Sequence, residues 1–312
     1  MFSLFGPQKK QIRYKYDFNS LFAGYQIVSV SLGSNQEICC LGVDHSPELT
    51  DGMFPPSATE KHHQYKITIL TEYQTQTLML PNQRWNYHFV QPAGNDEFLV
   101  VSARSHKYKD DSYDCNGKVF SINGELKREF LLGDGIQDLA VNSDGTIWTS
   151  YFDEGVFGNY GWDKPVGSAG LLAWNMAGEK RFAYDGEAGT IEDCYALNAA
   201  NDHDTWFYFY SDFHLVRLTD FRVTANYECP IQGSDGFAVY DQWFLFRGGY
   251  GKRDVYTLFS LSDKGRLVKK KELVFVDQAG SPITASQVYC RGRYMLLLDK
   301  YILYLIDLKE LV

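Results

Sequence analysis

Four carboxylates carry the clearest chemical signal in this chain. Asp134 lies in the turn sequence GDG, and Asp138 follows it near the start of an expected strand. Glu192 and Asp193 are adjacent and open another expected strand. Hard oxygen ligands of this kind favour calcium or magnesium, and a bound ion would suit a metal-dependent hydrolase of the lactonase type. Carboxylates that cap turns give the same pattern, and the Asn and His companions of such a lactonase are missing, so we expect no metal and no cofactor.

The other residues that could do chemistry form no recognisable motif. His62 and His63 are the only adjacent histidine pair, and neighbours on an extended chain point to opposite sides, which disfavours joint metal binding. The signatures GxSxG, HExxH, DxDxDG and the P-loop are absent. Six cysteines occur without a CxxC motif, as expected of small buried side chains in a reducing compartment. We therefore assign no catalytic residue and expect a protein that is not an enzyme.

Charge is unevenly distributed along the chain. The net charge is −9, yet residues 134–220 alone hold 15 acidic and 4 basic residues. Residues 247–271 hold 8 basic and 2 acidic residues. The acidic segment is expected to attract a basic partner and to repel phosphate. Nucleic acid is therefore not expected as a direct ligand.

Nothing in the hydropathy pattern suggests a membrane protein. The longest apolar stretches, 294–299 and 301–308, have the length of a strand, whereas a membrane-spanning helix needs roughly 20 apolar residues. The first residues also lack the basic-then-apolar order of a secretory signal. We expect a cytoplasmic protein that makes no contact with a membrane.

The elements that position these residues are short strands. Aromatic or β-branched runs separated by polar turns recur from about residue 11 to the end, with almost no segment of helical period. They fall into five groups of four strands and a last group of three, over the ranges 26–80, 86–132, 136–184, 191–228, 235–273 and 286–308. One strand, 11–18, is left over at the N-terminus.

This count predicts an all-β protein. The expected fold is a β-propeller of six four-stranded blades in a single domain, 1–312, with the N-terminal strand completing the last blade and closing the ring. Five or seven blades, or a pair of β-sandwiches, are the alternatives. Gly124, Gly178 and Gly265 lie between the last two strands of three of the groups, where hairpin turns are required.

Long connections gather where a propeller would expose them on one face. They join the second and third strands of the first three groups and span 44–63, 104–117 and 153–169. Loops longer than about 12 residues in a compact domain are usually functional or disordered. The third connection mixes aromatic and acidic residues, which suits an interface anchor. The same rings could instead fold back against their own blade.

Two stretches carry a resemblance to known proteins. GDGIQDLAVNSDGTIWTSYFDEGVFGNYGW (133–162) and PVGSAGLLAWN (165–175) resemble a segment of uncharacterised bacterial propeller-like proteins. In size, acidity and strand content the whole chain is similar to propeller-type immunity proteins of bacterial contact-dependent growth inhibition systems, which neutralise toxic RNases of the EndoU class. The resemblance implies an inhibitor whose partner is a basic RNase toxin domain. The charge pattern agrees, because an acidic inhibitor reaches a phosphate-binding site quickly and can occlude it.

The expected partner surface is built by 104–117, 153–169 and 185–193. We use the name acidic rim for its six acids, which would pair with Lys or Arg of the toxin: Asp153, Glu154, Asp163, Glu187, Glu192 and Asp193. Phe157, Tyr160 and Trp162 would form the desolvated centre of the interface. We expect a monomer that forms a 1:1 complex. The rival hypotheses are the metal-dependent hydrolase and a sugar-binding propeller that uses exposed Trp and Tyr.

Overall fold

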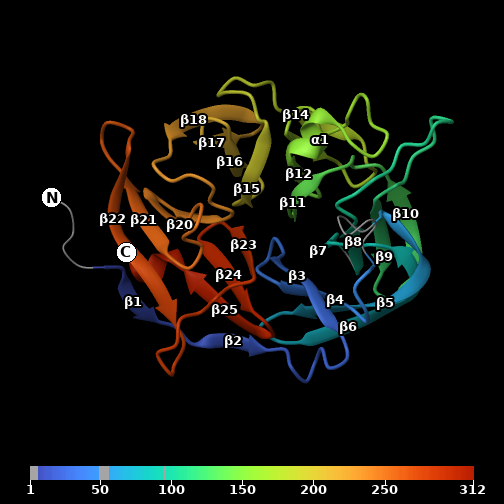
Figure 1. Cartoon of the computed structure of the whole chain (residues 1–312), viewed down its shortest axis with the longest axis horizontal. Coiled ribbons are helices and arrows are strands. Elements are labelled where there is room, and N and C mark those ends of the chain that lie inside the picture. Colours follow the sequence, from blue (N-terminus) through green and yellow to red (C-terminus); the bar gives the residue numbers. More distant parts are fainter. Residues whose placement is uncertain (1–5, 49–55, 95) are drawn as a thin grey trace. The chain divides into compact units, whose positions relative to one another are not determined.

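The computed structural model describes residues 6–48, 56–94 and 96–312. This part of the chain is built of strands with one short α-helix and one 3-10 helix (Figure 1). It divides into two compact units, which we call the central unit (Leu21–Cys194) and the terminal unit (the residues up to Ser20 together with Tyr195–Val312). The single domain expected over 1–312 stays a prediction.

The central unit holds three four-stranded antiparallel sheets. Their strands in chain order are β3 (Gln26–Leu32), β4 (Ile38–Val43), β5 (Ala58–Leu70) and β6 (Thr75–Trp85); β7 (Phe89–Pro92), β8 (Glu97–Val101), β9 (Gly117–Ser121) and β10 (Leu126–Phe130); and β11 (Ile136–Val141), β12 (Ile147–Tyr151), β13 (Leu171–Trp174) and β14 (Lys180–Ala183). Neighbours in each sheet are also neighbours in sequence, so each sheet is a meander. The helix α1 (Asp153–Phe157) lies between β12 and β13.

The terminal unit holds three more sheets. Their strands are β15 (Asp193–Ala199), β16 (Asp204–Tyr210), β17 (His214–Thr219) and β18 (Arg222–Glu228); β19 (Phe237–Tyr240), β20 (Trp243–Arg247), β21 (Tyr256–Leu261) and β22 (Leu267–Val276); and β23 (Gln287–Arg291), β24 (Tyr294–Asp299) and β25 (Ile302–Asp307). The first two residues of β15 belong to the central unit. The chain ends in η1 (Leu308–Leu311).

The N-terminal segment forms two strands, not the single strand predicted at 11–18. β2 (Tyr14–Asp17) pairs antiparallel with β25 and completes the last sheet, as predicted. β1 (Gln8–Gln11) pairs parallel with β22 and adds a fifth strand to the preceding sheet. β22 runs to Val276, three residues beyond the predicted end at 273. At residues 273–276, the outer edge of β22 would have no partner strand without β1, and β1 pairs with it there.

The inner strands are buried on both faces. In β8, Phe98 and Val100 pack in a cluster with the β3–β6 sheet, whereas Leu99 and Val101 pack in a cluster with the β11–β14 sheet. β20 of the terminal unit divides its side chains between two neighbouring sheets in the same way. Since successive side chains of a strand point to opposite faces, this is the face-to-face packing of propeller blades. It also explains why inner strands read as continuous apolar runs.

Two long connections differ from the prediction. β5 begins at Ala58, so part of the 44–63 connection is strand; its first residues are polar and largely exposed, and give no apolar alternation. Residues 49–55 of that connection lie outside the described residues. The 153–169 connection begins with α1, whose five residues are too few to show a helical period.

Three smaller expectations concern turns, cysteines and membrane spans. Gly124, Gly178 and Gly265 have φ of 81°, 79° and 68° at their hairpins, a conformation that glycine adopts without strain. All six cysteines are free thiols. Within the described residues, no helix has the length and apolar character required to cross a bilayer.

Candidate functional site

The helix α1 presents two of the predicted residues to solvent. Val156 is buried in the core between the second and third sheets of the central unit. With Val156 inward, Asp153 is exposed and the Phe157 side chain is 66% exposed. A Cβ atom on Gly135 would lie 2.4 Å from the backbone of Gly155, so the helix rests directly on the turn before β11. This contact fixes the position of the exposed residues on the sheet.

A buried arginine joins the loops that carry the acidic rim. Arg104 Nε and Nη2 donate to the two carboxylate oxygens of Asp134, each at 2.9 Å. Arg104 Nη1 also forms an ion pair of 2.6 Å with Glu154, and the guanidinium lies 4.0 Å from the centre of the Tyr160 ring. Burial raises the pKa of Asp134, and the guanidinium of Arg104 opposes that rise. Glu154 and Tyr160 thus hold the predicted surface together from within the chain.

Trp162 also folds back onto the protein. Its side chain is 8% exposed, and its Nε1 donates to the carbonyl oxygen of Ser105 at 2.7 Å. The backbone N–H of Lys107 donates to the Tyr160 carbonyl oxygen at 2.9 Å. Trp162 and Tyr160 thus fold back against the 104–117 connection of the neighbouring sheet, not against their own blade, while Phe157 faces solvent.

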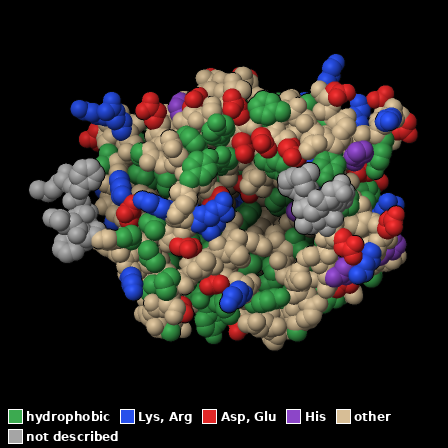
Figure 2. Space-filling model, in the orientation of Figure 1, with side chains coloured by type: hydrophobic (Ala, Val, Ile, Leu, Met, Phe, Trp, Pro, Cys, Tyr) green, Lys and Arg blue, Asp and Glu red, His purple; other side chains and the backbone are tan. Residues whose placement is uncertain are grey.

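The structure brings together two acids of the acidic rim, Asp153 and Asp193. Burial, and then the negative charge of Asp153, raise the pKa of the half-buried Asp193 to about 7. Glu192 is half-buried, and Asp163 and Glu187 are exposed. Within the described residues, no Lys or Arg forms an ion pair with any of these five acids. Acidic side chains gather on the surface around α1 (Figure 2).

The carboxylates of the hydrolase hypothesis lie in different environments. Asp134 already accepts hydrogen bonds from Arg104 on both oxygens and from the Ser105 backbone N–H at 2.8 Å. Asp138 is half-buried in β11. In the described part of the chain these two acids, Glu192 and Asp193 form no cluster with ligand atoms close enough for one ion. Asp134 acts instead as a structural ion-pair partner.

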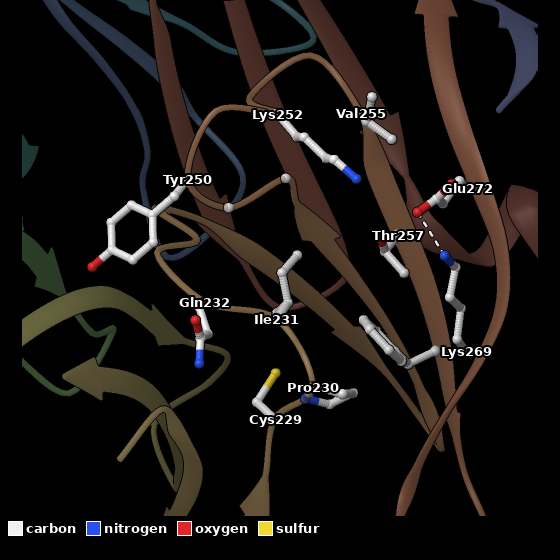
Figure 3. A pocket seen from close by; sticks show the side chains of 13 residues that line it. Cys229, Pro230, Ile231, Gln232, Tyr250, Lys252, Val255, Thr257, Lys269 and Glu272 are labelled. Atoms are coloured by element: carbon white, nitrogen blue, oxygen red, sulfur yellow. Dashed lines mark hydrogen bonds and ion pairs between the residues drawn. The ribbon is translucent and has the colours of Figure 1, made fainter. Parts of the chain in front are cut away.

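The terminal unit contains a cavity that sequence reasoning did not identify. Its volume is about 520 Å³, and the segment after β18, the loop after β20 and strands β21 and β22 line it. Tyr250 stands on one side, and the ion pair between Lys269 and Glu272, at 2.6 Å, stands on the other (Figure 3). Burial raises the pKa of the Cys229 thiol at this cavity to about 12, so a reactive thiolate is disfavoured.

Tyr250 belongs to a group of aromatic rings. The Tyr195 ring stacks on Tyr210 with centroids 6.1 Å apart and meets Tyr250 edge-on at 6.3 Å. Phe213 contacts all three rings. Tyr210 and Tyr250 are 39% and 60% exposed. The sequence offered no signal for this group, because aromatic residues in strands also fill the core of an all-β protein.

One comparison concerns sequence families. A family model described as the YxzG family matches residues 171–305, which is under half of the chain. The match begins with β13 and ends within β25, and it therefore includes the aromatic group around Tyr250 and the cavity of the terminal unit. No curated protein matches the sequence.

Solved structures provide the second comparison. The β-propeller domain of Cps50 (Swd1) from Myceliophteria thermophila is similar to this chain with a TM-score of 0.52 and 7% identity, over 91% of this chain and 84% of that chain. A catalytically inactive virginiamycin B lyase from Staphylococcus aureus, with quinupristin, gives a TM-score of 0.49 and 10% identity, over 90% and 94% of the two chains. The likeness to the Cps50 domain and the six sheets confirm the predicted fold class, an all-β, six-bladed β-propeller. Identity this low is informative about fold alone.

Proposed function

We propose that this propeller is a binding protein, not an enzyme, whose acidic rim docks a basic protein. The partner we propose is a nuclease toxin domain of the EndoU class, which the protein neutralises in the cytoplasm by covering the active site. The observation that carries this proposal is the pair formed by Asp153 and Asp193. Burial, and then the charge of Asp153, raise the pKa of Asp193 to about 7, and no Lys or Arg of the described chain forms an ion pair with either acid.

A cationic side chain from a partner would relieve this repulsion. Burial has removed water from around Asp193, and Asp153 adds a second negative charge. A Lys or Arg placed between the two carboxylates favours the ionised form of both, so binding the cation and losing the proton from Asp193 are coupled. Phosphate or nucleic acid would add to the repulsion instead.

Contacts from the protein interior support the surface around this pair. Arg104, Tyr160 and Trp162 tie the connections 104–117 and 153–169 together from behind. Binding therefore does not require these loops to become ordered, which lowers the entropic cost of association. This assigns new roles to two of the three predicted aromatic residues. Tyr160 and Trp162 support the surface, and Phe157, which is 66% exposed, supplies the apolar contact.

A basic nuclease suits this surface for two reasons. A nuclease site must attract phosphate, so it presents Lys or Arg groups that an acidic surface can engage. Charge complementarity also accelerates association, which matters for an inhibitor that must bind before the toxin reaches its substrate. The resemblance to propeller-type immunity proteins agrees with this charge argument.

Inhibition of a purified EndoU-type RNase domain, encoded next to the gene for this chain, tests the proposal. The native protein should inhibit RNA cleavage at a 1:1 ratio. A variant with Asp153→Lys, Glu187→Lys and Asp193→Lys should inhibit at least about 100-fold less, because each buried or partly buried charge pair that is lost costs about 2 kcal/mol or more. Inhibition by the native protein should weaken as salt is raised.

A matched control is Asp263→Lys, which reverses an exposed acid in the turn between β21 and β22. This variant should inhibit like the native protein. Equal inhibition by the triple variant and the native protein would refute the assignment of the surface. No inhibition of the RNase domain by the native protein at any ratio would refute the choice of partner.

A second candidate function is sugar binding by the terminal unit. The observation that favours it is the exposed pair Tyr210 and Tyr250 next to a cavity of about 520 Å³. Aromatic rings at a concave site can stack on a sugar face. A glycan array with the native protein and a Tyr250→Ala variant tests this function. Binding that the variant loses supports it, and a blank array counts against it.

A further inference from the structure

The end of β4 and the start of β5 bring three potential metal-binding residues together. The two strands pair antiparallel up to Val43 and Tyr65, and the Asp44 backbone N–H continues the pairing by donating to Gln64 O at 3.0 Å. His45 therefore lies opposite His63. One side-chain atom from each of Asp44, His45 and His63 lies within 4.8 Å of the others. The two imidazole rings are 4.4 Å apart, centre to centre.

The hydrogen bonds fix which imidazole nitrogens are available. His45 Nδ1 lies 2.8 Å from Asp44 Oδ1, and His63 Nδ1 lies 3.2 Å from the carbonyl oxygen of His45. Both oxygens are acceptors, so each Nδ1 donates to its oxygen, and in the neutral imidazole each Nε2 carries the lone pair. An oxygen acceptor on the distal nitrogen is the arrangement that orients metal-binding histidines in proteins.

The lone pairs are poorly satisfied by the protein itself. His45 Nε2 is buried and has no hydrogen-bond partner in the described part of the chain. His63 Nε2 lies 2.9 Å from the Thr59 hydroxyl, but that hydroxyl also lies 2.7 Å from the carbonyl oxygen of Lys61, to which it can donate. A buried ring nitrogen without a partner is costly, and this cost indicates a missing ligand.

The surroundings suit a cation. The His63 side chain is almost completely buried, so the protein holds its ring in place. A cavity of about 490 Å³ opens at the histidines, and Glu48 and Glu60 line it. Lys61 also lines the cavity and opposes a cation. The three carboxylates of Asp44, Glu48 and Glu60 outweigh this single charge.

We propose that His45 and His63 bind one divalent transition-metal ion through their Nε2 atoms, with zinc the preferred ion. Asp44 orients His45 by accepting its Nδ1 proton. Glu48 or Glu60 and water complete the coordination, since zinc takes nitrogen and oxygen ligands in tetrahedral geometry. The bound ion would link the residues after β4 to β5 and so stabilise the connection between them.

Isothermal titration of the purified full-length protein with zinc chloride, after treatment with a chelator, tests this site. The native protein should bind one zinc ion per chain. His45→Ala should abolish this binding, and Asp44→Asn should weaken it about tenfold, because the loss of an orienting partner reduces metal affinity. Cobalt in place of zinc should give the absorption bands of tetrahedral coordination, which a purely structural role of the histidines would not produce.

His62→Ala is the matched control. His62 directly precedes His63 in β5 and is exposed. It lies on the other side of the strand, with its Nδ1 2.5 Å from Asn82 Oδ1. This variant should bind zinc like the native protein. His63 is buried, so His63→Gln is compared only if its thermal unfolding remains cooperative, and it should then bind no zinc. Absence of stoichiometric binding to the native protein, or equal binding by the native protein and His45→Ala, would overturn the proposal.

Discussion

Asp193→Asn should stabilise the protein more at neutral and alkaline pH than in mild acid. Burial and the charge of Asp153 raise the pKa of Asp193 from its ordinary 3.8 to about 7. Between these two values the folded protein keeps a proton that the unfolded chain has released. The free energy of unfolding therefore falls as pH rises through this window, because the unfolded state binds fewer protons than the folded state. Asn carries no charge at any of these pH values, so the variant should lack this loss.

The size of the effect follows from the shift. One pKa unit corresponds to about 1.4 kcal/mol, so the full shift would lower stability by about 2.7 kcal/mol between about pH 5 and pH 8. Asp193 is only half-buried, and solvent screening weakens its interaction with Asp153. We allow for about half of this value, so the stabilisation by Asn should grow by about 1 to 1.5 kcal/mol between about pH 5 and about pH 8.

Urea denaturation of the native protein and the variant, across this pH range, measures the effect. Asp153→Asn should recover part of the same stabilisation, because it removes the repulsion but not the burial. Asp263→Asn, at an exposed turn, serves as the control and should follow the native profile. Parallel profiles for Asp193→Asn and the native protein, or a carboxyl resonance of Asp193 that titrates near pH 4, would refute the reasoning about this pair.

Four further substitutions test the support of the acidic rim and its apolar contact. Arg104→Met should lower the free energy of unfolding by about 3–5 kcal/mol in urea denaturation, because it leaves the buried carboxylate of Asp134 unpaired, and adding Asp134→Leu should restore much of that loss. Trp162→Phe should cost about 1–2 kcal/mol, since the Ser105 carbonyl oxygen loses its donor, and an unchanged midpoint would contradict that role. Phe157→Ala should change stability by less than about 0.5 kcal/mol, yet weaken RNase binding in calorimetry by about 2 kcal/mol.

Periodicity predicted most of the sheets because blade strands bury both faces. The run containing Phe98 and Val101 is continuously apolar, and the structure divides its side chains between two neighbouring sheets. The N-terminal strand was also predicted to complete the last sheet, since one group lacked a fourth strand. β1 was missed because its sequence, QKKQ, has no apolar residue, and its pairing depends on the length of β22. Local sequence gives no sign that a strand will pair with another one far away in the chain.

The candidate site was predictable in charge but not in geometry. The count of acids identified the segment that contains Asp153 and Asp193, because net charge needs no knowledge of contacts. The burial of Trp162 could not be decided, since an aromatic residue in a loop can serve an interface or a core equally well. Arg104 in a polar loop gave no sign that it would be buried with two acidic partners. Likewise, His45 and His63 lie together only because β4 and β5 pair across a long connection.

Hydrogen–deuterium exchange of the protein with and without the EndoU-type RNase domain tests the central claim most directly. The account predicts that the partner slows exchange in the segments around α1 and in residues 185–193, and that this protection disappears at high salt. Protection confined to the lysine-bearing strand β22, or no change in exchange at saturating RNase, would contradict it.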